Sequence, residues 1–317
     1  MSDFPIKDLN DPITTNLIDQ FELKTILVNQ VEFSLIEMGP SSGELALCLH
    51  GFPDTAFTWR YLLPELASQG YRAVAPFQRG YWPTKAPENA SYQTGALVKD
   101  ACSLHDYLSP GKKGVIIGHD WGAFAAYGAC AWRPEAWRKA VTCAVPPVAA
   151  MANAFFSFEQ LKRSWYMFFF QVPLAEAAFS MNDLEMIAKL WADWSPGYDA
   201  SQDLVHVKNA LRNDENLSSA LGYYRAMFDP SKHDASLSQE QSAVMMPTPQ
   251  PLLYIHGRDD GCLSVDLAKS AQSYLTGDSQ MHIIEDAGHF MNVEKPQEFN
   301  AKVLEFLGPA QPGVSLE

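Results

Sequence analysis

Cysteine is scarce in this 317-residue sequence, and its spacing argues against two kinds of cross-linked scaffold. The chain has 5 cysteines and no C-x-x-C pair. An odd count without close spacing argues against a disulfide framework and against a structural zinc site. Thiols in apolar contexts behave as small hydrophobes, so we expect reduced side chains. The residues are Cys48, Cys102, Cys130, Cys143 and Cys262.

Positive charge and long apolar runs are scarce as well. Lys and Arg total 23 against 37 acidic residues, giving a formal net charge of −14. Such a surface repels nucleic-acid phosphates and anionic membranes, so we expect neither as a partner. The longest apolar stretch, residues 165–179, is interrupted by Gln171, Pro173 and Glu176 and is too short to span a bilayer. The first residues show no leader pattern, and the sequence therefore predicts a cytoplasmic protein.

The order of apolar runs and helical patterns predicts the fold class. Short apolar runs alternate with helical patterns in the first half and again after residue 251. This alternation predicts an α/β fold with a mostly parallel sheet and helices on both faces. We expect strands at residues 25–28, 31–38, 45–49, 73–77, 114–118, 139–145, 252–256 and 281–285, and helices at residues 57–68, 95–108, 265–274 and 296–306.

The middle of the chain differs from the rest, because it shows helical patterns and no convincing strand. Leu217, Leu221, Tyr224 and Phe228 form one apolar helical stripe, and residues 183–194 carry another. Proline clusters bracket the region on both sides. We therefore predict an all-helical cap at residues 147–247, inserted into an α/β core formed by residues 1–146 and 248–317.

One aspartate stands between a predicted strand and a predicted helix. The segment Gly118-His119-Asp120-Trp121-Gly122 follows an apolar run and precedes a stretch of small residues. Glycines permit close packing where a strand turns sharply into a helix, and a helix N-terminus favours an anion. Asp120 could serve simply as an N-cap. A carboxylate, however, needs no base to act as a nucleophile, and it suits attack on a saturated carbon with formation of an alkyl ester.

These motifs, taken in chain order, resemble those of the α/β-hydrolase-fold epoxide hydrolases, the aspartate-nucleophile branch that is related to haloalkane dehalogenases. In that fold the nucleophile stands on a strand–turn–helix elbow, where a serine is more usual. The resemblance covers nearly the whole chain. It is carried by His50-Gly51-Phe52-Pro53, Arg79-Gly80-Tyr81, residues 118–122, Tyr166 five residues before Gln171, Gly222-Tyr223-Tyr224-Arg225, Gly257-Arg258-Asp259-Asp260 and Gly288-His289-Phe290.

The resemblance implies a catalytic triad completed by a histidine and a second acid. His289, last in chain order, would activate a water that cleaves the ester. Asp260 would orient the imidazole and stabilise the imidazolium, with the adjacent Asp259 as the alternative. The remaining loop and strand-end histidines, His105, His256 and His282, are interpreted as solvated.

The resemblance also implies an oxyanion hole. The backbone N–H groups of Phe52 and Trp121 would form it and bind the negative oxygen that develops when water attacks the ester. A cis Pro53 would belong to the same turn. The side chains of Phe52 and Trp121 would line the substrate site.

Two tyrosines of the predicted cap would assist ring opening. By the resemblance, Tyr166 and Tyr224 bind the substrate and protonate the epoxide oxygen. Tyr224 lies on the apolar stripe of its helix and is expected to point inward, whereas Tyr223 falls on another side of that helix.

Together these expectations describe an epoxide hydrolase that forms a vicinal diol, with a small apolar epoxide and water as its substrates. No metal-ligand spacing or phosphate-binding loop appears, so no cofactor or metal is expected. A monomer or a homodimer is compatible with the sequence.

Other reactions remain open at this stage. A haloalkane dehalogenase shares the nucleophile and Trp121; Phe52 stands where many of these enzymes carry an asparagine, although others use a cap tryptophan, for which Trp165, Trp191 and Trp194 are candidates. Fluoroacetate dehalogenases carry an arginine where this chain has Trp121. A non-catalytic protein of this fold would not need a complete set of catalytic residues. A serine esterase is disfavoured because no serine occupies the elbow.

Overall fold

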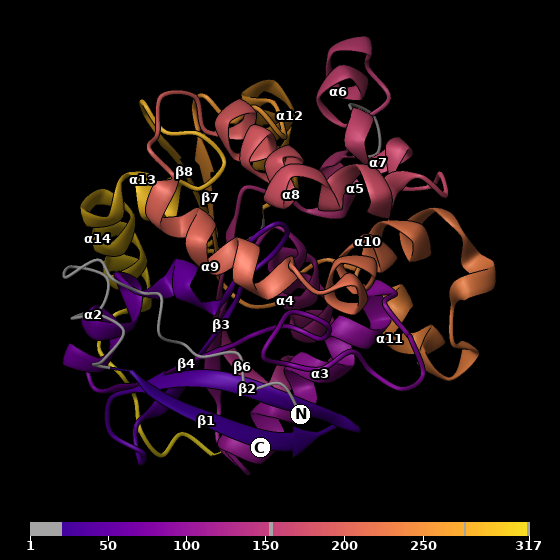
Figure 1. Ribbon diagram of the computed structural model, residues 1–317. Helices are drawn as coiled ribbons and strands as arrows, with labels where there is room; N and C mark the ends of the chain where they lie inside the picture. The colour runs from indigo at the N-terminus through magenta and orange to yellow at the C-terminus, as the bar shows by residue number, and fades with distance from the viewer. Residues whose placement is uncertain (1–20, 152–154, 276, 316–317) are drawn as a thin grey trace.

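The computed structural model describes residues 21–151, 155–275 and 277–315, and it confirms the predicted α/β class (Figure 1). Eight strands form one sheet in the order β1-β2-β4-β3-β5-β6-β7-β8. β1 and β2 form an antiparallel hairpin, β2 pairs antiparallel with β4, and the pairings from β4 to β8 are parallel. Each predicted strand is present: β1 Glu22–Val28, β2 Val31–Met38, β3 Glu44–Leu49, β4 Tyr71–Pro76, β5 Gly114–His119, β6 Trp137–Cys143, β7 Leu252–Gly257 and β8 Gln280–Ile284.

The central strands are buried on both faces of the sheet. Along β3, Leu45 and Leu47 belong to one apolar cluster, whereas Ala46 and Cys48 belong to another. This alternation follows from the two-residue repeat of a strand, and it places apolar residues on both faces of a parallel sheet. Helices α3 (Thr94–Leu108), α4 (Trp121–Trp132) and α11 (Ser238–Ala243) pack together on one face, and α2 (Leu62–Ser68) packs with α14 (Pro296–Leu307) on the other.

Two predicted helices are divided. The helix expected at residues 57–68 is a 3₁₀ turn, η2 (Ala56–Trp59), followed by α2. Pro64 explains where α2 begins, because proline has no N–H to donate and is tolerated in a helix only near its first turn. The helix expected at residues 265–274 is likewise α12 (Val265–Ser270) followed by a 3₁₀ turn, η6 (Ala271–Tyr274).

Between β6 and β7, the described residues form helices and no strand. These helices lie over one end of the sheet in Figure 1, except α11, which packs against α3 and α4. The longest of them changes direction at Asn182, Asp183 and Leu184, whose φ angles are 51°, 54° and 59°. Their bounds are α5 Val148–Met151, α6 Phe158–Arg163, α7 Trp165–Phe169, α8 Ala175–Trp194, α9 Ser201–Leu211, α10 Asp214–Phe228 and α11.

Two further expectations can be compared with the fold. The five cysteines are all buried and free, which confirms the absence of a disulfide framework. In the three described stretches of the chain, no helix has both the length and the apolarity to cross a membrane.

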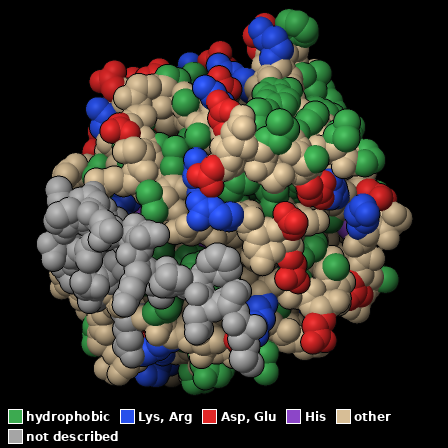
Figure 2. All heavy atoms as spheres, in the orientation of Figure 1, with side chains coloured by type: hydrophobic (Ala, Val, Ile, Leu, Met, Phe, Trp, Pro, Cys, Tyr) green, Lys and Arg blue, Asp and Glu red, His purple; other side chains and the backbone are tan. Residues whose placement is uncertain are grey.

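Hydrophobic side chains also gather on the outer surface of the helical segment. Figure 2 shows such a cluster over α6 and α7. Phe156 and Phe158 are 70% and 74% exposed, and Trp165 and Phe168 of α7 are 39% and 41% exposed. The outward side of α7 is therefore apolar, while Tyr166 of the same helix is buried.

Candidate active site

Asp120 occupies a sharp turn between β5 and α4. Its φ of 52° is positive, a backbone conformation that residues other than glycine rarely adopt. The turn is tightly packed: a Cβ at Gly118 would lie 2.1 Å from the Gly122 carbonyl oxygen, and a Cβ at Gly122 would lie 2.1 Å from that of Leu49. Glycine is therefore required at both places, and Asp120 is held at the carboxyl end of the sheet.

Backbone N–H groups surround the Asp120 carboxylate. The N–H of Phe52 donates to Asp120 Oδ1 at 2.7 Å, and the N–H of Trp121 also lies within hydrogen-bonding range of the carboxylate. Burial raises the pKa of Asp120 to about 6, although the charge of His289 and these two N–H groups oppose the shift. The peptide bond that follows Phe52 is cis, as predicted for Pro53. Asp120 Oδ1 thus accepts a hydrogen bond from the backbone, and Oδ2 lies on the side that faces His289.

The carboxylate that contacts His289 is that of Asp260. His289 Nδ1 and Asp260 Oδ2 lie 2.9 Å apart, and both side chains are fully buried. The other oxygen, Asp260 Oδ1, accepts from the backbone N–H groups of Cys262 at 2.7 Å and Leu263 at 2.9 Å. These three contacts fix the carboxylate and, through it, the orientation of the imidazole. His289 Nε2 then points toward Asp120, 3.9 Å from its Oδ2.

The charges of Asp120, His289 and Asp260 support one another. Burial alone would lower the pKa of His289, but the charge and hydrogen bond of Asp260, together with the charge of Asp120, raise it above the usual value. Burial would likewise raise the pKa of Asp260, but the charge and hydrogen bond of His289 lower it. The site therefore favours an imidazolium between two carboxylates while Asp120 is ionised.

The structure brings Tyr166 and Tyr224 together from two different helices. Their rings lie 5.5 Å apart, on α7 and α10, and both side chains are buried. Burial raises the pKa of both hydroxyl groups well above the usual value. The Tyr224 ring also lies 5.0 Å from that of Trp121 and 5.2 Å from that of Phe52. Both tyrosines therefore belong to the surroundings of Asp120.

Several polar atoms around Asp120 are buried without a hydrogen-bond partner among the described residues. They include Tyr224 Oη, Trp121 Nε1, His289 Nε2 and Trp194 Nε1. A buried polar group without a partner costs free energy, and such groups are characteristic of sites that bind a ligand or a water. The walls between them are aromatic: the Trp194 ring lies 4.9 Å from Tyr166 and 5.1 Å from His289.

Two sequence interpretations need correction, and a third residue adds a detail. His256 is buried rather than solvated, because its Nδ1 lies 2.8 Å from Tyr254 Oη and its Nε2 lies 3.1 Å from the Leu263 carbonyl oxygen. His105 is also buried, in contact with the ring of Trp137. Tyr223 lies on a different side of α10 from Tyr224 but is equally buried, since its hydroxyl donates to the Arg79 carbonyl oxygen at 2.8 Å.

Cys262 is a neighbour of the site that the sequence reasoning treated only as a hydrophobe. Its Sγ lies 3.3 Å from Tyr166 Oη. Ligand atoms of Asp260, Cys262 and His289 lie within 4.8 Å of one another, a set that could in principle hold a metal. Asp260 and His289 are instead hydrogen-bonded directly to each other, as the acid and the histidine of a catalytic triad are. The position of Cys262 two residues after Asp260 was the available signal.

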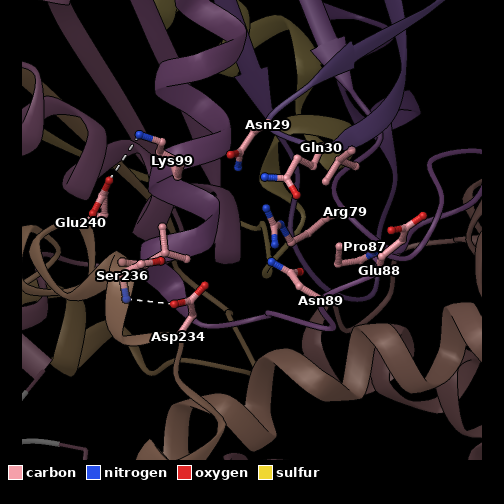
Figure 3. A pocket seen from close by; sticks show the side chains of 12 residues that line it. Asn29, Gln30, Arg79, Pro87, Glu88, Asn89, Lys99, Asp234, Ser236 and Glu240 are labelled. Atoms are coloured by element: carbon pink, nitrogen blue, oxygen red, sulfur yellow. Dashed lines mark hydrogen bonds and ion pairs between the residues drawn. The ribbon is translucent and has the colours of Figure 1, made fainter.

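A separate polar cavity of about 250 Å³ lies away from these residues (Figure 3). It is lined by side chains from the first hairpin, the loop after β4, α3, the segment before α11 and α11 itself. Charged groups of both signs face it, among them Arg79, Lys99, Asp234 and Glu240. None of the predicted catalytic residues lines this cavity, so it is distinct from the candidate active site.

Known proteins resemble this chain over most of its length. Residues 46–302 match the alpha/beta hydrolase family. Epoxide hydrolase 4 of Homo sapiens is 30% identical over 292 residues, which cover 87% of this chain and 76% of that protein. The AB hydrolase superfamily protein YfhM of Bacillus subtilis (strain 168) is 29% identical over 294 residues, which cover 92% of this chain and 99% of that protein. The crystal structure of epoxide hydrolase VrEH1 from Vigna radiata superposes with a TM-score of 0.74 at 27% identity, covering 92% of this chain and 99% of that one.

Proposed function

The chain belongs to the alpha/beta hydrolase family and is a hydrolase, and we propose that it opens epoxides to vicinal diols through an ester on Asp120. One observation carries the proposal. A buried aspartate has one oxygen held by the backbone N–H of Phe52 and the other on the side of a histidine, and two buried tyrosines belong to the same surroundings. In this proposal the segment 147–247 acts as a cap that places the tyrosines over Asp120. The relatives named epoxide hydrolase support the same reaction.

The first step is attack of Asp120 Oδ2 on one epoxide carbon. A new carbon–oxygen ester bond forms, the ring carbon–oxygen bond breaks, and negative charge moves to the former ring oxygen. Tyr166 or Tyr224 transfers its phenolic proton to that oxygen and becomes a phenolate. An alkoxide resembles hydroxide, whose conjugate acid water has a pKa of about 15.7, whereas free tyrosine has a pKa of about 10. The transfer is therefore favourable by up to about 8 kcal/mol, and burial of the tyrosines reduces this difference.

The second step is hydrolysis of the ester by a water activated by His289. Esterification removes the negative charge of Asp120, which is one of the charges that raise the pKa of His289, so the imidazolium passes its extra proton to the tyrosine phenolate and the neutral imidazole can act as a base. It takes a proton from water, and the hydroxide attacks Cγ of the ester. The N–H groups of Phe52 and Trp121 stabilise the oxyanion. The diol leaves with the proton that His289 took from water, and the carboxylic acid left at Asp120 gives its proton to His289, which restores the resting state.

The surroundings of the proposed site favour an apolar substrate. Phe52, Phe170 and Tyr224 contact one another through their rings, and the backbone N–H of Phe52 donates to Asp120. The outward side of α7 is apolar as well (Figure 2). We therefore propose a small apolar epoxide as the substrate class, because desolvation of an apolar molecule at these walls is favourable.

Two indole groups favour haloalkane dehalogenation as the second candidate. Trp121 Nε1 and Trp194 Nε1 are both buried without a hydrogen-bond partner among the described residues, and a departing halide could accept from both. Trp191 is not available for this, since its Nε1 donates to the Pro53 carbonyl oxygen at 2.8 Å. The tyrosine pair has no role in halide release, and it therefore favours epoxides.

Two assays on one preparation test the proposal. Diol formation is measured from styrene oxide, and halide release is measured from a bromoalkane of similar size. The proposal predicts diol without appreciable halide. Halide without diol would select the dehalogenase, and neither product would contradict both candidates. The Asp120→Ala variant serves as the control for background hydrolysis in both assays.

A further inference from the structure

The two tyrosine hydroxyls over Asp120 are not equivalent. Tyr166 Oη lies 3.3 Å from the Sγ atom of Cys262, within hydrogen-bond range of sulfur. Tyr224 Oη has no such contact with Cys262, and the donor that lies toward it is the Trp121 indole. All three side chains are buried, so water does not compete freely for these contacts. The difference points to Cys262 as a group that hydrogen-bonds one tyrosine and not the other.

The backbone of Cys262 is fixed on both sides. Its N–H donates to Asp260 Oδ1 at 2.7 Å, and its carbonyl oxygen accepts from Gln160 Nε2 at 2.8 Å. Gln160 belongs to α6, the helix that precedes α7 and Tyr166. The same Gln160 side chain accepts from the N–H of Ser264 at 3.1 Å, so it joins the helical segment to the loop that carries Asp260. Cys262 and Tyr166 are therefore held against each other by contacts that do not involve the thiol.

The geometry at the thiol allows two directions of the hydrogen bond. If Tyr166 donates to sulfur, its proton is engaged and must be released before it can reach an epoxide oxygen. If sulfur donates to Tyr166 Oη, the phenolic proton stays free to point toward the substrate. Burial raises the pKa of the Cys262 thiol well above its usual value, although the contact with Tyr166 opposes this shift, so the thiol carries a proton that it can donate.

We propose that Cys262 is a positioning residue whose S–H group donates to Tyr166 Oη and leaves the phenolic proton of Tyr166 for the epoxide oxygen. This inference rests on the proposed function. When the ring opens, the phenolic proton moves to the former ring oxygen, and the S–H bond remains directed at the new phenolate. The thiol itself loses no proton. A hydrogen bond to a charged oxygen is stronger than one to a neutral oxygen, so the contact favours the transition state over the ground state.

The test compares three substitutions that separate hydrogen bonding from packing. Cys262→Ala and Cys262→Val remove the donor, alanine with a smaller side chain than cysteine and valine with a larger one. Cys262→Ser keeps a donor. Single-turnover ring opening is followed by the quenching of tryptophan fluorescence, with Trp121 and Trp194 next to the proposed substrate position. We expect both the alanine and the valine variants to open the epoxide about three- to tenfold more slowly, and the serine variant to retain the wild-type rate within about twofold.

The same Cys262 substitution in two tyrosine variants identifies the residue through which Cys262 acts. In Tyr166→Phe, which has no hydroxyl, Cys262→Ala should cause no further loss, whereas in Tyr224→Phe it should cause the same loss as in the wild type. Ester hydrolysis should be unchanged by all Cys262 variants. Cys102→Ala, at a buried thiol on α3, is the matched control, and thermal melting shows that each variant folds.

Each other outcome contradicts the proposal. A valine variant with the full wild-type rate would reduce Cys262 to packing. An alanine variant that is faster than wild type would mean that the thiol withholds the Tyr166 proton. An equal alanine penalty in the Tyr166→Phe background would show that Cys262 acts elsewhere. These results leave epoxide opening by the wild type intact, whereas absence of diol from the wild type itself would overturn the proposed function as well.

Discussion

His289 Nε2 lies 3.9 Å from Asp120 Oδ2, whereas His289 Nδ1 is held by Asp260 Oδ2 at 2.9 Å. The imidazole is therefore bonded on one side and directed at Asp120 without a hydrogen bond on the other. Its Nε2 atom is buried and has no partner among the described residues. A water or an ester carbonyl next to Asp120 is thus within reach of an oriented base, and this relationship underlies the predictions that follow.

Replacement of His289 should stop the reaction at the ester. His289→Gln keeps Asp120 and the tyrosines, so the epoxide can open, but no base remains to activate water. Intact mass spectrometry should show the protein with the mass of one whole epoxide added. His282→Gln, at a histidine that pairs with Glu298 near the surface, is the control and should turn over without an adduct. An adduct-free His289→Gln variant that still makes diol at the wild-type rate would refute the role of His289.

Loss of both tyrosine hydroxyls should slow ring opening and leave ester hydrolysis unchanged. General-acid assistance contributes about 10²–10⁴-fold, so the Tyr166→Phe/Tyr224→Phe double variant should lose about that factor in the single-turnover opening rate. Tyr223→Phe is the matched control on the same helix, because its hydroxyl donates to the Arg79 backbone rather than toward Asp120. If the control loses as much as the double variant, the tyrosines act through the fold and not through the proton.

Ring opening should depend on pH through the Asp120 carboxylate. Burial raises the pKa of Asp120 to about 6, and only the ionised form is a nucleophile. The opening rate should therefore rise with pH through about 6 and should fall about tenfold per unit well below it. Single-turnover rates across this range provide the measurement. A pH–rate curve with its midpoint near 3.8, the ordinary pKa of an aspartate, would indicate that burial does not raise the pKa of Asp120.

A buried ion pair joins the sheet domain to the helical segment, and breaking it should destabilise the protein. Arg60 Nη1 lies 2.7 Å from Asp203 Oδ1, with side chains only 5% and 4% exposed. Asp203→Ala leaves a buried guanidinium without its partner, which costs about 3–5 kcal/mol in the free energy of unfolding. Asp266→Ala, which breaks an exposed pair with Lys269, should cost less than about 1 kcal/mol. Denaturant unfolding of the two variants should separate them clearly, and equal losses would contradict this account.

Stability should fall as pH rises because of Asp54. Burial, partly opposed by hydrogen bonds from Thr58 and Thr55, raises the pKa of Asp54 from 3.8 to about 8. Between these values the folded chain holds a proton that the unfolded chain has released, so unfolding becomes easier with each increase in pH across this window. Asp54→Asn removes this dependence and should flatten the plot of melting temperature against pH. An unchanged slope in the variant would show that another group is responsible.

The strand–turn–helix position of Asp120 was predictable because its signals are local. Gly118 and Gly122 stand where an added Cβ would meet backbone atoms, and the apolar run of β5 precedes them. The parallel sheet was predictable for the same reason, because the two-residue alternation along β3 and its neighbours buries both faces. Whether Asp259 or Asp260 contacts His289 depended on the conformation of the turn that follows β7. In the structure this turn brings the Asp260 carboxylate into contact with His289.

Contacts between distant parts of the chain could not be derived from local patterns. The Arg60–Asp203 pair joins residues 143 positions apart, and the contact between Tyr166 and Cys262 joins residues 96 positions apart. Nothing in the spacing of either residue indicates its partner. The burial of His256 was missed because it depends on Tyr254 of the same strand and on the loop that ends at Leu263. Contacts of this kind, between the helical segment and the sheet with its loops, are tertiary and leave no local pattern in the sequence.

The most direct test of the covalent ester is a single turnover in heavy-oxygen water. If water attacks Cγ of an ester on Asp120, the label must enter the Asp120 carboxylate, and the diol must carry an unlabelled oxygen from that carboxylate. Peptide mass spectrometry of the segment that contains Asp120, together with the mass of the diol, measures both. The proposed mechanism predicts label in the peptide and none in the diol after the first turnover. Label that appears directly in the diol while Asp120 remains unlabelled would contradict it.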